Sequence, residues 1–83
     1  GLFADRVIRR VGSAPQKQIT ECWRLALSRH PMSEELHEGQ VSLMRLTTHW
    51  REVEGETDES AARKSLASFC HAIMNSAAFL YID

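Results

Sequence analysis

Apolar residues recur every three or four positions in four separate segments of this 83-residue chain. That spacing places one apolar stripe along each of four helices. A chain of this length supports one small core, so the four stripes are expected to meet in a shared interior. The sequence therefore predicts an all-α fold, a small four-helix bundle with a docked C-terminal tail, formed as a single domain by residues 1–83.

Glycine, proline and capping residues indicate where the first two predicted helices begin and end. Gly12 ends the first stripe, where a left-handed glycine commonly terminates a helix. Ser13, followed by Pro15 and then Gln16, is the expected N-cap of the second helix. Pro31 disfavours helical backbone at the residue before it, so the second helix is expected to end before that proline.

Capping residues also indicate where the third and fourth predicted helices begin. Ser33 is the expected N-cap of the third helix, and Thr57 or Asp58 is the expected cap of the fourth. The stretch between them, residues 52–60, has five acids and no apolar period, which is typical of a solvated loop. The predicted helices span roughly residues 2–12, 14–29, 33–51 and 58–75. The apolar end FLYI at residues 79–82 is expected to pack back onto the bundle.

The predicted core consists of large apolar residues from the last three helices: Trp23, Leu27, Leu43, Trp50, Leu66, Phe69 and Ile73. Met44 is expected on the buried edge of the third helix. The aromatic residues could instead form a groove for a ligand or peptide, with Trp23, Trp50, Phe69, Phe79 and Tyr81 as its walls. Five large aromatics are about what a core of this size needs, so a structural role is the expectation.

Charge divides along the chain. Residues 1–31 carry six basic residues against two acids, and residues 32–83 carry four against nine, so the formal net charge is −1. This balance removes the general attraction that nucleic acids or anionic membranes exert on a small basic protein. The local alternative is a nucleic-acid contact through Arg6, Arg9, Arg10 and Lys17. Acids at the start of the third helix would repel phosphates, so neither a nucleic acid nor a membrane is expected as a partner.

Two cysteines and four histidines are the candidate chemical groups. Cys70 and His71 match the end of the haem-attachment pattern C-x-x-C-H, but Ala67 replaces its first cysteine. Cys22 and Cys70 lie in apolar stripes, where a thiolate is disfavoured, and two distant cysteines make no disulfide framework or zinc site. No histidine has a second one four residues away, as a helical zinc motif requires. We therefore expect no catalytic residue, no cofactor and no metal ligand.

Three stretches resemble a known family: FADRVIRR at the start, ITECWRLALSRHPMSEEL in the middle and LASFCHAIMNSAAFLYID at the end. They resemble the C-terminal end of the planctomycete-specific domain of unknown function, the PSD type. The family pattern reads roughly YRLALGRPPTAEEL and then ALCHALLNSNEFLYVD. Its members are large secreted proteins that often carry cytochrome c-like and lectin-like domains as well.

The resemblance implies that this chain is the terminal helical segment of a larger exported protein, periplasmic or extracellular, and that any haem belongs to another domain. The expected function is a non-catalytic structural or protein-interaction module that contacts upstream domains of that protein or a protein partner. The resemblance also suggests contacts through Asn75, Phe79, Tyr81 and Asp83. The alternative is an accessory part of a redox or hydrolytic enzyme, with His71 and Cys70 beside a site that other domains complete.

Overall fold

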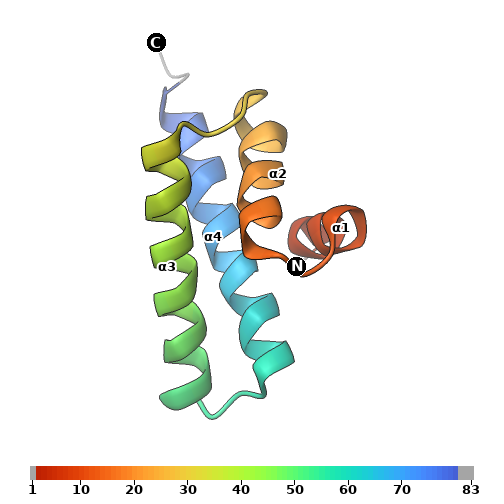
Figure 1. Cartoon of the computed structure of the whole chain (residues 1–83), viewed down its shortest axis with the longest axis vertical. Coiled ribbons are helices and arrows are strands. Elements are labelled where there is room, and N and C mark those ends of the chain that lie inside the picture. The colour runs from red at the N-terminus through yellow and green to blue at the C-terminus, as the bar shows by residue number, and fades with distance from the viewer. Residues whose placement is uncertain (1, 81–83) are drawn as a thin grey trace.

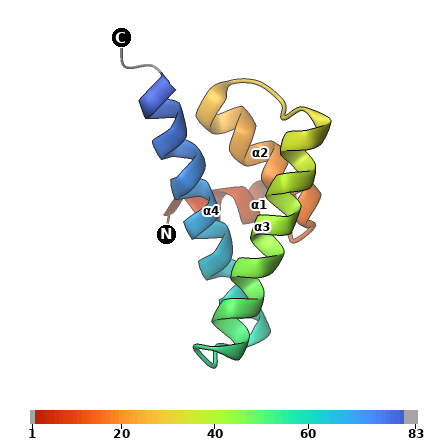
Figure 2. The same ribbon diagram turned by 90° about the vertical axis from the view of Figure 1, so that its left-hand side faces the viewer.

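The computed structural model describes residues 2–80, with side chains described over residues 4–76. This part of the chain contains four α-helices and no strand: α1 (Leu2–Val11), α2 (Pro15–Leu27), α3 (Ser33–Glu52) and α4 (Asp58–Leu80). Helices α2, α3 and α4 run along the long axis of the molecule, whereas α1 crosses them at the side of α2 and α4 (Figures 1 and 2). The predicted all-α bundle of four helices is confirmed.

Two of the predicted helix ends are confirmed. Gly12 has a φ of +82°, and its N–H donates to the carbonyl of Ile8 over 2.8 Å, so this left-handed glycine terminates α1. At the start of α4, the N–H of Ser60 donates to Thr57 Oγ1 over 3.2 Å. Thr57 is therefore the residue that caps α4.

Two other predicted caps are wrong. Ala14, without a side-chain hydrogen bond, occupies the N-cap of α2, so Ser13 does not cap this helix and the start depends on the preset φ of Pro15. Met32 occupies the N-cap of α3, one residue before Ser33. The Glu35 carboxylate accepts the N–H of Met32 over 2.8 Å, and this bond caps the helix. The predicted first residue of the helix, 33, is nevertheless confirmed.

Helix α4 continues past residue 75, where the sequence predicted its end, and reaches Leu80. Asn75 and Ser76 therefore lie within the helix rather than at a stop. The Ser76 hydroxyl donates to the carbonyl of Ala72 over 3.0 Å, a bond that lets serine remain in a helix. The side chain of Phe79 and all of residues 81–83 lie outside the described residues, as does the docking predicted for them.

Helices α2 and α4 form the centre of the bundle, since each of them contacts all three of the other helices, and the most extensive contact is that between α3 and α4. The buried apolar residues come from all four helices: Ala4, Val7, Ile19, Cys22, Leu43, Ala61, Leu66, Phe69 and Cys70. Of the predicted core residues, Leu43, Leu66 and Phe69 are buried, whereas Trp23, Leu27, Trp50 and Ile73 are half-buried. The placement of Met44 was wrong, because this side chain is 63% exposed. Neighbouring residues on a helix point about 100° apart, so Leu43 faces the core and Met44 does not.

Gly39 allows α3 to approach its neighbours closely. A Cβ at this position would lie 3.1 Å from Ile19 Cγ2 of α2 and 3.2 Å from Phe69 Cζ of α4. Both of those side chains are buried and have little room to move. The glycine, which lowers the helix propensity of this segment, is therefore part of the packing between α2, α3 and α4.

Candidate functional site

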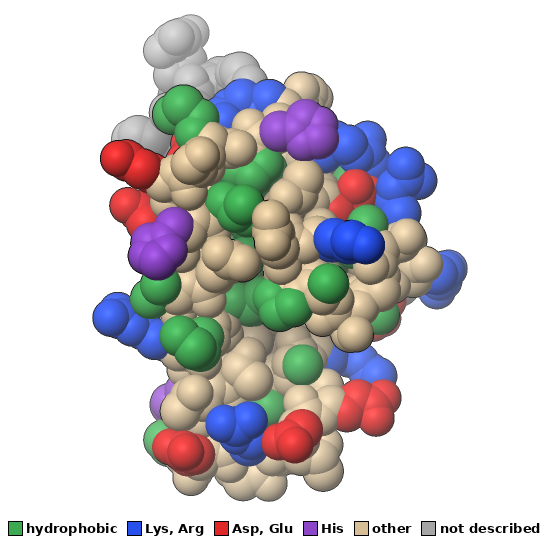
Figure 3. Space-filling view, viewed as in Figure 1, with side chains coloured by type: hydrophobic (Ala, Val, Ile, Leu, Met, Phe, Trp, Pro, Cys, Tyr) green, Lys and Arg blue, Asp and Glu red, His purple; other side chains and the backbone are tan. Residues whose placement is uncertain are grey.

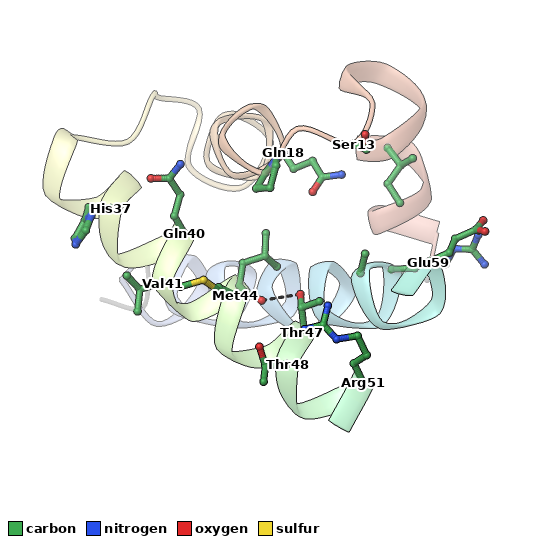
Figure 4. Close-up of a pocket in the computed structure, with 15 residues that line it drawn as sticks. Ser13, Gln18, His37, Gln40, Val41, Met44, Thr47, Thr48, Arg51 and Glu59 are labelled. Carbon is green, nitrogen blue, oxygen red and sulfur yellow. Dashed lines mark hydrogen bonds and ion pairs between the residues drawn. The ribbon is translucent and has the colours of Figure 1, made fainter. Parts of the chain in front are cut away.

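The candidate site is a groove between α1 and α3. Both helices contact α2 and α4, but within the described part of the chain they do not contact each other. The space between them is closed on the inside by the start of α2 and the first half of α4, and it forms a groove of about 810 Å³ (Figure 4). Grooves of a few hundred to a thousand Å³ are of the size that binding sites occupy.

The walls of the groove are mainly apolar. The apolar side chains come from every helix: Ile8, Pro15, Val41, Leu43, Met44 and Ala62. Hydrophobic side chains gather along the middle of this face, between α3 and α2 (Figure 3). Among these side chains, that of Met44 is 63% exposed. An exposed methionine beside a buried leucine gives a soft apolar surface that can adapt to a partner.

Neutral polar groups surround this apolar surface. Gln18 and Ser13 lie across the groove from Met44, Thr47 and Thr48 of α3 (Figure 4). The Gln18 side-chain amide donates to the carbonyl of Gly12 over 2.8 Å, and the Thr47 hydroxyl donates to the carbonyl of Leu43 over 2.8 Å. Two rim side chains are thus held in place by the bundle itself.

The charged groups at one end of the groove are compensated within the chain. Arg51 Nη1 lies 3.6 Å from Asp58 Oδ1. Arg63 lies 3.4 Å from Glu59 Oε1 and 4.0 Å from Asp5 Oδ1. Because of these ion pairs, this end of the groove has no excess of positive or negative charge. The groove therefore suits an apolar occupant rather than an ionic ligand.

Of the four interaction residues predicted from the sequence, Asn75 has a described side chain, and it does not line this groove. Asn75 is exposed on α4, while the Phe79 side chain, Tyr81 and Asp83 lie outside the described residues. Sequence reasoning missed the groove because it assigned Met44 to the core. The available signal was the spacing of Val41, Met44 and Thr48, which lie three and four residues apart and so share one face of the helix.

The structure separates the two residues of the proposed Cys–His site. Cys70 has no exposed surface and lies against Cys22, with 2.7 Å between the two sulfur atoms, whereas His71 is exposed. The contact with Cys70 and burial raise the pKa of the Cys22 thiol, which therefore stays protonated. A nucleophile needs a base within hydrogen-bond reach, and Cys70 has its contact with a second thiol.

The remaining histidines and the basic residues are distributed over the surface. His30, His37 and His49 are exposed, and His49 lies 3.8 Å from the Glu54 carboxylate. Within residues 4–76, no group of three or more metal-ligating side chains is placed to hold a metal ion. The basic residues singled out above are exposed as well: Arg6, Arg9, Arg10 and Lys17. Arg10 contacts Glu21, so it takes part in the packing of α1 on α2.

Among the described helices, none has the length and apolar content needed to cross a membrane. The sequence matches no protein-family model, and no curated protein or solved structure is similar enough to be recognised as a relative.

Proposed function

We propose that this chain is a non-catalytic helical module that binds a protein segment in the groove between α1 and α3. The observation that carries the proposal is the exposure of Met44, 63%, within a groove whose walls are mainly apolar. Exposed apolar surface in a concave site costs free energy in water and favours association with a complementary apolar surface. Methionine is enriched at protein interfaces relative to the rest of the surface.

The proposed occupant is the apolar face of an amphipathic helix, supplied by the part of a larger exported protein that precedes Gly1. Helix-in-groove binding uses apolar anchors flanked by neutral or polar groups, and this groove offers such walls, with Gln18 and Thr47 at its rim. The compensated charges of Arg51 and Arg63 give no reason for a strongly charged occupant. The resemblance to the end of the planctomycete-specific PSD domain supports the upstream region as the source.

The buried cysteines support a binding role over the alternative of an enzyme site. A site built from Cys70 and His71 would need both side chains at one surface. Cys70 is fully buried against Cys22, whereas His71 is exposed, and neither lines the groove.

The test is a binding measurement between this 83-residue chain and the polypeptide encoded directly before Gly1, each purified separately and mixed in a calorimeter. We expect saturable binding with a negative heat-capacity change, the sign of apolar burial. Met44→Glu should weaken it at least tenfold, because a charge would enter an apolar interface. Absence of binding by the folded wild-type chain would contradict the proposal.

Met32→Glu is the matched control. Met32 is exposed to the same degree as Met44, 65% against 63%, but it lies at the start of α3 and does not line the groove. A glutamate at the N-terminus of a helix is compatible with the helix dipole, so the fold should be retained. Equal weakening by both substitutions would place the binding surface outside the groove and overturn the assignment.

A further inference from the structure

Cys22 and Cys70 bring two sulfur atoms together at the contact between α2 and α4. The residues are 48 positions apart in the sequence, and neither has any exposed surface. Their sulfur atoms lie 2.7 Å apart. No other pair of cysteines exists in the chain, so these two side chains have only each other as thiol partners within one molecule.

The distance is short for two groups that are not bonded. Non-bonded heavy atoms settle about 3.5–4.0 Å apart, and sulfur is larger than carbon, whereas the two sulfurs of a disulfide lie about 2.0 Å apart. The observed 2.7 Å lies between these two values, so the two sulfur atoms are in direct contact but are not bonded. Packing of Ile19, Leu66 and Phe69 around the two residues holds α2 and α4 at this separation, so formation of a bond needs little movement of the helices.

We propose that Cys22 and Cys70 form a disulfide that joins α2 to α4 when the chain folds in an oxidising compartment. The bond would close a loop of 48 residues that contains all of α3 and the two turns on either side of it. A cross-link over such a loop restricts the unfolded chain and thereby stabilises the fold. The inference concerns the interior of the bundle and is independent of what the groove binds.

The chemistry is thiol–disulfide exchange with a low-molecular-weight disulfide such as oxidised glutathione. The thiolate of one cysteine attacks a glutathione sulfur, which forms a mixed disulfide and releases one glutathione thiolate. The thiolate of the second cysteine then attacks the protein sulfur of that mixed disulfide, which forms the Cys22–Cys70 bond and releases the second glutathione. Two protein thiols are oxidised, one glutathione disulfide is reduced to two thiols, and the two protons go to solvent or glutathione.

The first attack takes place before α2 and α4 pack together. In the folded chain both sulfurs are inaccessible, and burial disfavours the thiolate that exchange requires. The same inaccessibility protects the bond once it has formed, because a reducing thiolate cannot reach either sulfur. Cys22 and Cys70 therefore act as a structural cross-link and not as a reactive dithiol.

The test refolds the denatured, reduced chain in a buffer of oxidised and reduced glutathione and then alkylates it with a maleimide in denaturant. We expect no alkylated cysteine, and tryptic digestion should release residues 18–24 joined to residues 65–83. Two alkylated cysteines in the refolded protein, or glutathione retained on either one, would overturn the proposal. This readout needs only the wild-type chain, so it does not depend on the folding of any variant.

The thermal midpoint provides a second measurement. Reduction with dithiothreitol in denaturant, followed by refolding without oxidant, should lower the Tm by about 10 °C or more relative to the oxidised protein. The double variant Cys22→Ala, Cys70→Ala is the control, and its Tm should not respond to dithiothreitol. An equal response in wild type and double variant would show that the effect does not come from this bond and would contradict the inference.

Discussion

Glu21 of α2 binds Arg10 of α1, with Oε2 of the carboxylate 3.1 Å from Nε of the guanidinium. Arg24, one turn further along α2, donates to the two oxygens of the same carboxylate over 3.0 and 2.6 Å. The Glu21 side chain is only 7% exposed, so one nearly buried carboxylate holds two arginines. This contact fixes the short helix α1 against the bundle and thereby keeps one wall of the groove in position.

Glu21→Gln should destabilise the fold by about 1–2 kcal/mol, because two charge-assisted interactions of a nearly buried group are lost. Chemical denaturation followed by circular dichroism measures the change. Glu38→Gln is the control, since Glu38 is an exposed acid of α3, and its effect should stay within about 0.5 kcal/mol. An equally small effect at residue 21 would show that the contact between α1 and α2 does not depend on this carboxylate.

Stability should fall in acid. Hydrogen bonds from Arg24 hold the pKa of Glu21 below its ordinary value of 4.5, as hydrogen bonds from Arg29 do for Glu35. A carboxyl whose pKa is lower in the folded state stabilises the fold fully above its unfolded pKa, and that contribution is lost as the pH falls through the folded pKa. Unfolding free energies measured from pH 7 to pH 2 should therefore decline below about pH 4.5.

The variant Glu21→Gln separates the contribution of residue 21 to this acid response. Its free energy of unfolding should lie below that of wild type at pH 7, and the difference should narrow as the pH falls through the folded pKa of Glu21. A difference that stays constant down to pH 2 would assign the acid response to other carboxyls.

Gly39→Ala should destabilise the bundle by about 1 kcal/mol, although alanine is the better helix former. The gain in helix propensity is about 1 kcal/mol, but the new Cβ would lie 3.1 Å from Ile19 and 3.2 Å from Phe69, both buried. Ser42→Ala on the exposed face of α3 is the control and should be neutral or slightly stabilising. Thermal melts give the Tm of each variant relative to that of the wild type. A higher Tm for Gly39→Ala would show that α3 can move outward to make room for the methyl group.

Phe69→Ala should cost about 3–5 kcal/mol, because the ring is buried at 6% exposure in the cluster shared by α2, α3 and α4. That is a large part of the stability of a domain this small, so we expect loss of the cooperative transition at 37 °C. Met74→Ala on the same helix is the control, since Met74 is 44% exposed. Similar melting of the two variants would contradict the central position of Phe69.

Binding of the upstream segment should also depend on the end of the chain. From the sequence, Phe79 and Tyr81 are expected contacts, and aromatic anchors carry much of the affinity at protein interfaces. Phe79→Ala and Tyr81→Ala should each weaken binding about tenfold in the same calorimetric measurement. His71→Ala, an exposed residue of α4, is the control. Unchanged affinity in both aromatic variants would confine the interface to the groove.

The sequence predicted the helices well because helical periodicity and helix caps depend on residues within about four positions of one another. The stripe of α2 placed Ile19 and Cys22 on the buried face, where both have no exposed surface. Gly12 and Thr57 end and begin helices through bonds within four residues. The predicted end of α4 was wrong because the hydroxyl of Ser76 donates a hydrogen bond to a carbonyl within the helix, so this residue does not stop it.

Features that depend on how the helices are placed against one another could not be predicted. The contact between Cys22 and Cys70 requires a particular rotation and height of α4 against α2, which neither stripe specifies. The role of Gly39 depends on two side chains from other helices. The groove exists because α1 crosses the bundle and does not contact α3, and a stripe of apolar residues carries no information on crossing angle.

The place of α4 as the last helix in the sequence has a consequence for folding during synthesis. The buried cluster joins apolar residues of α1, α2 and α3 to Leu66, Phe69 and Cys70 of α4, and the ribosome adds these three residues after the first three helices are complete. Until α4 has left the exit tunnel, α1 and α3 can contact α2 but lack the part of the core that α4 supplies, and short helices without tertiary packing are marginal in water. The nascent chain can therefore complete its core only after the last helix has been synthesised.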